Sequence, residues 1–354
     1  MGQGKTKLSN HIDELPERER YFGFTNFGQT CYMNSVLQAL YGCVAFRTEL
    51  LHRRDKEERD NLLACLTALF EQVAMNKKRL GVIRPERFFK RLRRDNPMFT
   101  PYQQQDAQEF LIFVLNRLSE LLQEEKPGGL AEAAAGEGNQ PPNKAPKTTW
   151  IQEMFEGRLR AETRCLCCET IRTREEAFLN LSVQCSQNTS ITGCLRDFSK
   201  VEYLTKVEKY FCDTCCSYQE GSKVLKVHRQ PKVLVVSLKR FQYLERLQCL
   251  VKMSARVPFP LELKLFNTTP EAGDQMYELQ AVVAHLGNRA NSGHYVAVVR
   301  SASYWLLYDD RTVQVVPETF LERLFGMTDA QKANSSWCDT AYILFYGAVR
   351  KADV

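Results

Sequence analysis

The first part of the chain carries apolar residues at helical spacing. From Tyr32 to Tyr41 they recur every three or four positions, which predicts a helix. A second helix is expected from Asp60, whose side chain suits an N-cap, through Val73. The longest apolar stripe covers residues 104–125 and predicts the most regular helix of the chain.

The second part of the chain changes to short runs rich in β-branched and aromatic residues. We expect strands at 177–183, 232–238, 278–284, 294–299 and 341–346. Helices first and strands afterwards indicate an α+β fold, in which a helical part packs on a sheet. The sequence shows no internal repeat.

Two segments lack the apolar residues of a core. Residues 126–149 are rich in Pro, Gly, Ala and Asn, so burial cannot offset their ordering entropy, and we expect a disordered insertion. Residues 1–20 are polar and contain no apolar signal-peptide core, so we expect a flexible N-terminal tail. No apolar run reaches the roughly 18–20 residues of a membrane span.

The densest basic run is 84–94. Helical spacing places Arg87, Lys90, Arg91 and Arg94 on one face of a helix and Phe88, Phe89 and Leu92 toward the other. We interpret this run as a solvated amphipathic helix rather than a polyanion-binding patch. The net charge of +6 is mild for 354 residues, and nothing else in the sequence indicates nucleic-acid recognition.

The chain has 13 cysteines and no secretion signal. We therefore expect a protein of the cytoplasm or nucleus, where thiols stay reduced and a disulfide framework does not form. Metal ligation, catalysis and core packing remain as roles for the thiols.

One thiol stands at the predicted start of the first helix. A helix N-terminus carries a partial positive charge and unpaired amide donors, which favour the nucleophilic thiolate of Cys31. Asn26, just upstream, could donate its side-chain amide to the oxyanion that forms when a carbonyl is attacked. A lone helix cysteine is usually a packing residue, and the surrounding motif is what indicates catalysis here.

A histidine and a carboxylate later in the chain complete a candidate triad. His294 follows Gly293 at a predicted strand start, where its ring can face a cleft. The next predicted strand ends in Asp309 and Asp310, and a return hairpin would set Asp309 beside His294. A third group in this place fixes the tautomer and orientation of the base. Asp310, the neighbouring acid, could support it.

Together these segments resemble the ubiquitin-specific proteases. The cysteine box NFGQTCYMNSVLQ, the segment QQDAQEF and the boxes SLKRF, GHY and WLLYDD occur in that family's order, beginning at residues 26, 104, 237, 293 and 305. The resemblance runs from about residue 21 to residue 346. It implies a papain-like cysteine protease core of helical thumb, sheet palm and zinc-bearing β fingers, and a deubiquitinase that cleaves the peptide or isopeptide bond after the C-terminal glycine of ubiquitin.

The family's catalytic residues map onto this chain one by one. Its nucleophile falls on Cys31, its oxyanion donor on Asn26, its base on His294 and the third member on Asp309. Two positions depart from the family's usual residues, and both keep a group that forms hydrogen bonds: Gln29 stands for Asn, and Gln108 for His.

The resemblance also implies a tail-binding site and domain limits. The acid that grips the arginine-rich tail of ubiquitin maps onto Asp106, since carboxylates pair with arginine, and Gln104 of the same box is a second candidate. The catalytic domain would span 21–349, with the thumb at about 21–125 and the palm at about 150–349. The fingers would occupy about 157–240 within that palm.

Four cysteines have the spacing of zinc knuckles: Cys165 with Cys168, and Cys212 with Cys215. The two pairs must meet to make a four-sulfur site, and reduced surface thiols are the alternative. The family's fingers often carry such pairs, which favours one structural zinc ion per chain. Cys167 and Cys216 are adjacent spare thiols. Packing is expected for the other cysteines outside the triad: Cys43, Cys65, Cys185, Cys194, Cys249 and Cys338.

Two other functions compete with deubiquitination. A ubiquitin-binding scaffold without catalysis would lack a triad member, and a cysteine–histidine enzyme acting on small amides would not need the fingers cysteines or the ordered boxes. Segments including 21–24, 78–85, 187–192 and 259–267 are most similar to those of the small family members activated by WD40-repeat proteins. That similarity implies a WD40-repeat activator that docks on the fingers.

Overall fold

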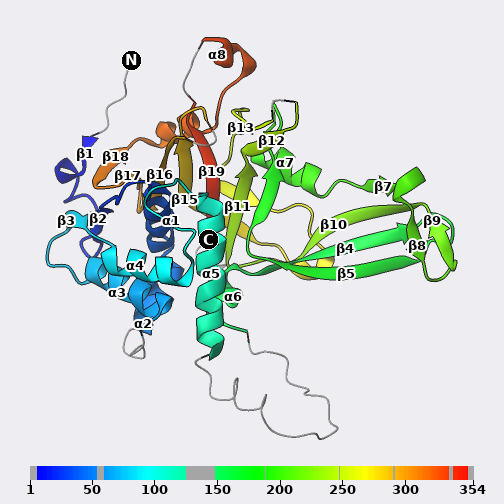
Figure 1. Ribbon diagram of the computed structural model, residues 1–354, viewed down its shortest axis with the longest axis horizontal. Coiled ribbons are helices and arrows are strands. Elements are labelled where there is room, and N and C mark those ends of the chain that lie inside the picture. Colours follow the sequence, from blue (N-terminus) through cyan, green and yellow to red (C-terminus); the bar gives the residue numbers. More distant parts are fainter. Residues whose placement is uncertain are drawn as a thin grey trace, which may run out of the picture.

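The computed structural model describes residues 6–53, 60–124, 148–187, 189–246, 248–289, 292–334 and 338–349. Within these ranges, helices gather on one side, a large sheet follows, and a smaller sheet extends away from both (Figure 1). The predicted α+β class is confirmed. None of the helices in the described ranges is long and apolar enough to cross a membrane.

The helical side is built largely from the first part of the chain. Its helices are α1 (Cys31–Gly42), α2 (Val44–His52), α3 (Leu62–Ala74), α4 (Glu86–Asp95), α5 (Ala107–Glu124) and α6 (Trp150–Phe155). Every residue of α1 from Cys31 to Tyr41 is buried, because this helix lies between the other helices and strand β16 of the large sheet. The two strands β2 (Tyr21–Phe24) and β3 (Leu80–Ile83) pair in parallel beside these helices.

The large sheet has nine strands. In spatial order, eight of them are β1 (Thr6–Lys7), β18 (Thr312–Val316), β17 (Tyr304–Asp309), β16 (His294–Ser301), β15 (Met276–Leu286), β19 (Thr340–Ala348), β11 (Val233–Lys239) and β6 (Leu181–Gln184), and β14 (Glu262–Lys264) also pairs with β15. Among the described strands of this sheet, only β11 and β6 pair in parallel. The strands predicted at 232–238, 278–284, 294–299 and 341–346 are confirmed within a few residues.

Both faces of this sheet are buried. Along β16, Ala297 and Val299 pack in the core shared with the helices, whereas Val296 and Val298 pack in a second core on the opposite face. Alternate side chains of a strand point to opposite faces, so a strand covered on both sides must be apolar at every position. This explains the unbroken apolar runs in the second part of the sequence.

The small sheet projects from the large one (Figure 1). It contains β4 (Gly157–Cys165), β5 (Ile171–Phe178), β7 (Glu202–Leu204) and β10 (Gly221–Arg229), and a hairpin of β8 (Tyr210–Cys212) and β9 (Ser217–Gln219) lies at its far end. We call this part the fingers. The remaining elements are β12 (Phe241–Leu244), β13 (Cys249–Lys252), α7 (Ile191–Phe198), α8 (Asp329–Asn334) and short 3-10 helices at Leu8–Asn10, Lys206–Glu208, Pro270–Ala272 and Glu318–Leu324.

One predicted strand is wrong. Residues 177–183 do not form a single strand, because β5 ends at Phe178 in the fingers and β6 begins at Leu181 in the large sheet. The Asn180 side chain holds the bend by donating to the hydroxyls of Ser182 and Ser237, at 3.0 and 3.1 Å. The expected fingers range of 157–240 therefore includes β6 and β11, which belong to the large sheet.

The expected flexible tail over residues 1–20 is wrong for residues 6–20. Strand β1 pairs with β18, and the side chains of Leu8 and Leu15 are buried in the core. Arg79 donates to the carbonyl of Leu15 at 2.9 Å, and Arg47 forms an ion pair with Glu19 at 2.6 Å. Two isolated leucines in a polar segment supply the apolar contacts that composition alone does not reveal. Residues 1–5 lie outside the described part.

Helix starts also differ from the prediction. The N-cap of α3 is Asn61, not Asp60: the Asn61 side chain accepts a hydrogen bond from Ala64 N at 2.8 Å. The helix predicted over 104–125 begins at Ala107, because Asp106 caps it. Most of the expected insertion at 126–149 lies outside the described residues; its last residue, Thr149, is the N-cap of α6.

The basic run forms α4, as predicted, and its apolar side is buried. Asp60 lies 3.5 Å from both Arg87 and Arg94, and Glu86 lies 2.8 Å from Lys90. Much of the basic face is therefore neutralised by neighbouring carboxylates, in agreement with a solvated helix.

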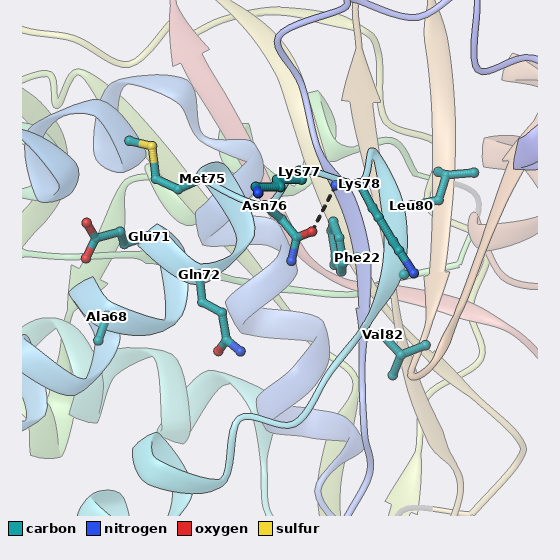
Figure 2. A pocket seen from close by; sticks show the side chains of 11 residues that line it. Phe22, Ala68, Glu71, Gln72, Met75, Asn76, Lys77, Lys78, Leu80 and Val82 are labelled. Atoms are coloured by element: carbon teal, nitrogen blue, oxygen red, sulfur yellow. Dashed lines mark hydrogen bonds between the residues drawn. The ribbon is translucent and has the colours of Figure 1, made fainter.

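A shallow hollow lies between the end of α3 and strand β3 (Figure 2). Glu71 and Met75 line it from the helix, and Lys78 and Val82 line it from the strand side. None of the catalytic or metal-ligand candidates lines this hollow. It is separate from the site described next.

Candidate active site

Three separate elements bring the predicted triad together. Cys31 is the first residue of α1 and is 2% exposed. His294 is the first residue of β16, and Asp309 is the last residue of β17. Because β16 and β17 form an antiparallel hairpin, the imidazole and the carboxylate lie side by side, as the predicted return hairpin requires.

The imidazole of His294 bridges the other two groups. Its Nε2 lies 2.7 Å from Asp309 Oδ1, which leaves Nδ1 for its hydrogen bond with the Cys31 thiol. The bond to Asp309, followed by the bond to Cys31, raises the pKa of His294 to about 10, although burial opposes the charge. At neutral pH the ring is therefore an imidazolium, suited to pair with a thiolate and to donate a proton.

Asn26 is held in one orientation by the loop before α1. Its Oδ1 accepts hydrogen bonds from the backbone N–H groups of Gly28 and Thr30, at 2.9 and 3.1 Å. Its Nδ2 donates to Asp310 Oδ2 at 2.8 Å. A side-chain amide nitrogen carries two N–H groups, so Asn26 has a second one that can donate to an oxyanion beside Cys31.

Asp310 has a more defined place than the sequence indicated. Besides Asn26, it accepts a hydrogen bond from the buried Asn34 Nδ2 at 2.7 Å. Its backbone carbonyl accepts from Phe24 N at 2.7 Å. Asp310 thus links the end of β17 to α1 and to the loop that carries Asn26. Sequence reasoning did not single out Asn34, although it belongs to the cysteine box.

In the QQDA segment, one side chain contacts the candidate active site and another makes structural contacts. Gln104 Nε2 donates to Gly293 O at 3.1 Å and lies 3.9 Å from Cys31 Sγ, which places this side chain at the catalytic centre. Asp106 accepts from Gln108 N at 2.7 Å and from the Tyr342 hydroxyl at 2.5 Å. Its carboxylate therefore caps α5 and joins this helix to β19.

The two residues that depart from the family's pattern lie apart from the triad's hydrogen bonds. Gln108 donates to Ser182 Oγ at 3.1 Å and so joins α5 to β6. Gln29 is exposed, and its backbone N–H donates to Pro101 O at 3.0 Å.

The four predicted metal ligands meet at the far end of the fingers. Their sulfur atoms all lie within 4.8 Å of one another, with 3.9 Å between Cys165 and Cys215 and 3.6 Å between Cys168 and Cys212. Tetrahedral zinc with bonds of about 2.3 Å to sulfur would separate its ligands by about 3.8 Å. The cluster therefore fits a metal ion of this kind without rearrangement.

The other cysteines can now be assigned. Cys167 and Cys216 are exposed and stand outside the four-sulfur cluster. The packing role predicted for Cys43, Cys65, Cys185, Cys194 and Cys338 is confirmed by their burial, which raises the pKa of Cys43 to about 12. The same prediction is wrong for Cys249, which is exposed on the two-stranded β12–β13 hairpin.

A thiol at a helix start, an imidazole and a carboxylate in this arrangement define a cysteine hydrolase of the triad type. Residues 22–346 match the family described as ubiquitin carboxyl-terminal hydrolase. The chain belongs to this family, whose members are thiol-dependent deubiquitinases.

Curated relatives match over almost the whole chain. Ubiquitin carboxyl-terminal hydrolase 12 of Salmo salar is 46% identical over 356 residues, which cover 98% of this chain and 95% of that protein. Ubiquitin carboxyl-terminal hydrolase 4 of Arabidopsis thaliana is 46% identical over 364 residues, which cover 98% of each.

Solved structures share the fold. The SAGA DUB module Ubp8/Sgf11/Sus1/Sgf73 bound to monoubiquitin matches with a TM-score of 0.76 and 23% identity, covering 97% of this chain and 74% of that one. The yeast SAGA DUB module with an Sgf73 variant matches with a TM-score of 0.74 and 25% identity over the same shares. The thumb–palm–fingers fold expected from the sequence is thereby confirmed.

Proposed function

We propose that Cys31, His294, Asp309 and Asn26 carry out hydrolysis of the peptide or isopeptide bond after the C-terminal glycine of ubiquitin on protein conjugates. The main support is the line of hydrogen bonds from the Cys31 thiol through the His294 ring to Asp309. Family membership supports the substrate class, and the geometry supports the roles proposed for these residues.

In the first step, the Cys31 thiolate attacks the carbonyl carbon of the glycine. The negative charge moves to the carbonyl oxygen, where Asn26 Nδ2 donates a hydrogen bond that is strongest in the transition state. When the carbon–nitrogen bond breaks, the His294 imidazolium gives its proton to the leaving amine. A thioester between Cys31 and ubiquitin remains.

In the second step, water replaces the amine. The neutral His294 takes a proton from this water, whose oxygen attacks the thioester carbon, and Asn26 again stabilises the oxyanion. Breaking the carbon–sulfur bond restores the thiolate–imidazolium pair and releases ubiquitin as a carboxylic acid, which loses its proton to solvent to become the carboxylate. Asp309 holds the ring throughout, because its hydrogen bond fixes which nitrogen faces Cys31.

Asp106 and Gln104 are our candidates for binding the ubiquitin tail. Asp106 supplies negative charge near the arginine-rich tail, and a carboxylate can accept further hydrogen bonds beyond those it makes to the fold. Gln104 lies between the thiol and the backbone carbonyl of Gly293, so its amide can orient the scissile bond.

The test is turnover of a fluorogenic ubiquitin C-terminal amide. Cys31→Ser should abolish turnover while ubiquitin binding persists, and Cys249→Ser, at an exposed thiol, should retain it. Reaction with ubiquitin bearing a C-terminal electrophile should add one ubiquitin mass to the parent chain and none to Cys31→Ser. Binding without turnover by the parent chain would instead indicate a scaffold.

For the four-sulfur cluster we propose one structural zinc ion, held by Cys165, Cys168, Cys212 and Cys215. The support is the match of the sulfur separations to tetrahedral geometry. Four thiolates leave no open position for water, so the ion would stabilise the fingers and take no part in hydrolysis. Metal analysis of protein purified without added zinc tests this assignment.

For regulation we propose a WD40-repeat activator that docks on the end of the fingers. The partner class rests on the sequence resemblance, and exposed apolar side chains support the place: Val207 is 97% exposed, Tyr218 69% and Phe211 48%. Phe211 and Tyr218 pack against each other with their ring centroids 5.7 Å apart, so the β8–β9 hairpin presents an exposed aromatic pair, and aromatic residues are enriched at protein interfaces. We also place the enzyme in the cytoplasm or nucleus, since none of its 13 cysteines, all in described residues, forms a disulfide.

A further inference from the structure

A buried lysine lies behind the catalytic histidine and has no part in the mechanism above. Lys252 is the last residue of β13 and is 6% exposed. Its ammonium donates to the backbone carbonyls of His285, Gly287 and Cys338 at 2.8, 2.6 and 2.8 Å. An ammonium has three N–H donors, so each of them is used by a carbonyl.

The three carbonyls come from segments that converge on the site. His285 lies in β15, and Gly287 directly follows the end of that strand, in the connection that leads to His294 at the start of β16. Cys338 stands just before β19, which carries the Tyr342 hydroxyl that contacts the QQDA segment. One side chain therefore joins the β12–β13 hairpin to both of these segments.

Close packing connects the backbone held by Lys252 to the residue that precedes His294. The backbone at Gly293 lies so near His285 that a Cβ there would sit 2.4 Å from His285 Nε2 and 2.6 Å from Leu286 O. The His285 ring is itself fixed, because it packs edge-on against Phe241 at 5.2 Å and against Tyr295 at 4.9 Å. A shift of the backbone that Lys252 holds at residues 285–287 would therefore displace Gly293, which directly precedes His294.

Burial and the surrounding charges determine how readily the Lys252 ammonium loses its proton. Asp339 and Cys338 favour its positive charge, whereas Arg240 opposes it, and burial is the main reason that the pKa of Lys252 falls to about 8. The neighbouring His285 is neutral, since burial lowers its pKa to about 3. Loss of the Lys252 proton removes one of three donors and leaves a buried carbonyl without its partner.

We propose that Lys252 is a positioning residue for hydrolysis: its ammonium fixes the backbone of residues 285–287, against which Gly293 packs, so that the imidazole of His294 stays aligned between Cys31 and Asp309. The proposal rests on the triad assigned above. Misplacement of a catalytic group by about 1 Å can cost about 100-fold in rate. The role of Lys252 should therefore appear in kcat rather than in ubiquitin binding.

The first test compares Lys252→Met, which keeps the length but loses the charge, with Lys252→Arg, which keeps charge and donors. Lys252→Met should lower kcat about 10- to 100-fold on ubiquitin amide, with the Kd for ubiquitin changed less than about threefold. Lys252→Arg should recover at least part of that loss. Active-site titration with the ubiquitin electrophile corrects for any inactive fraction.

The second test is the pH profile. The kcat of the parent chain should fall as pH passes about 8, well below the pKa of about 10 of His294. Lys252→Arg should lack that step, because guanidinium does not titrate there. Two results would overturn the proposal: a kcat of Lys252→Met equal to that of the parent chain after correction for active sites, or a fall in the kcat of Lys252→Arg at about pH 8. If Lys252→Met does not fold, the profiles of the parent and Lys252→Arg decide. Failure of the triad itself would appear separately, as turnover by Cys31→Ser.

Discussion

The amide of Asn26 is anchored by the carboxylate of Asp310, with Nδ2 and Oδ2 2.8 Å apart. Two consecutive acids therefore have two different partners. Asp309 orients the proposed base, His294, and Asp310 orients the proposed oxyanion donor, Asn26. In the proposed mechanism, the end of β17 therefore positions both the base and the oxyanion donor. The sequence shows only two adjacent acids, whereas the structure gives each a different partner: Asp309 contacts His294, and Asp310 contacts Asn26.

We predict that Asp310→Asn lowers kcat about 10-fold and Asp310→Ala lowers it more, toward the roughly 100- to 1,000-fold cost of losing an oxyanion donor. Asparagine keeps one acceptor and tolerates the φ of +47° at this position, whereas alanine keeps no acceptor and is strained there. Steady-state kinetics on ubiquitin amide measure the effect.

A double-mutant cycle distinguishes this role from general destabilisation. If Asp310 acts through Asn26, then Asp310→Asn should have little further effect in an Asn26→Ala background, since the donor is already absent. Additive losses in the double mutant would mean that the two side chains act independently, and would remove the anchoring role.

Sequence patterns predicted which residues meet at the candidate active site. A thiol before an apolar helix, and a histidine and an acid at opposite ends of a predicted hairpin, are local features, and Cys31, His294 and Asp309 meet as expected. Four of the five expected strands were also predictable, because burial on both faces of the large sheet makes their sequences largely apolar.

Polar contacts between distant segments were not predictable in the same way. Asn180 breaks the expected strand through bonds to a neighbour and to Ser237, which is far along the chain. The sequence around Lys252 does not distinguish it from an exposed lysine at a strand end. Its burial depends on three backbone carbonyls that later segments supply. The burial of Leu8 and Leu15 was unpredictable for a related reason, because the core residues around them lie far away in the chain.

We predict that the His294–Asp309 contact contributes stability that declines as pH rises. The pKa of His294 is raised from 6.5 to about 10, so its contribution is complete below about pH 6.5 and is lost as pH approaches 10. Asp309→Asn should therefore reduce the Tm more at pH 6 than at pH 9.5. Thermal unfolding of both proteins at several pH values measures this difference. A constant difference would contradict the raised pKa.

We predict that Gly293→Ala impairs catalysis more than its size suggests. The new Cβ would meet the ring of the buried His285 and the carbonyl of Leu286, so the backbone before His294 must move. We expect kcat to fall at least about 10-fold by misplacement of the base. The neighbouring Ser292→Ala, at an exposed position, is the matched control and should keep parental kcat. Equal activity of both variants would show that the turn adapts.

We predict that loss of the zinc ion proposed for the four-sulfur cluster unfolds the fingers and leaves the helical side folded. Cys212→Ser should bind less than one zinc ion per chain and lose protection from hydrogen exchange in β8 and β9 first. Zinc binding in small peptides is worth on the order of 10–16 kcal/mol, so the loss should be large even if the domain retains part of its structure. Cys216→Ser, at an exposed thiol outside the cluster, should keep its metal and its stability.

The last prediction concerns activation through the fingers. A WD40-repeat partner titrated into the purified chain should raise kcat, and coupling of about 1–3 kcal/mol corresponds to roughly 5- to 150-fold. Val207→Asp and Tyr218→Ala should weaken that activation and leave the unassisted kcat unchanged, because both side chains are mostly exposed and neither belongs to the candidate active site. Tyr218 lies in β9, and Val207 lies in the segment between β7 and β8. Truncating a central aromatic anchor typically costs at least about 2 kcal/mol, or about 30-fold in Kd. Val82→Asp, at an exposed position on β3, is the control and should be activated normally. Binding with a constant kcat would make the partner a targeting subunit, and unchanged activation of both fingers variants would place its docking site elsewhere.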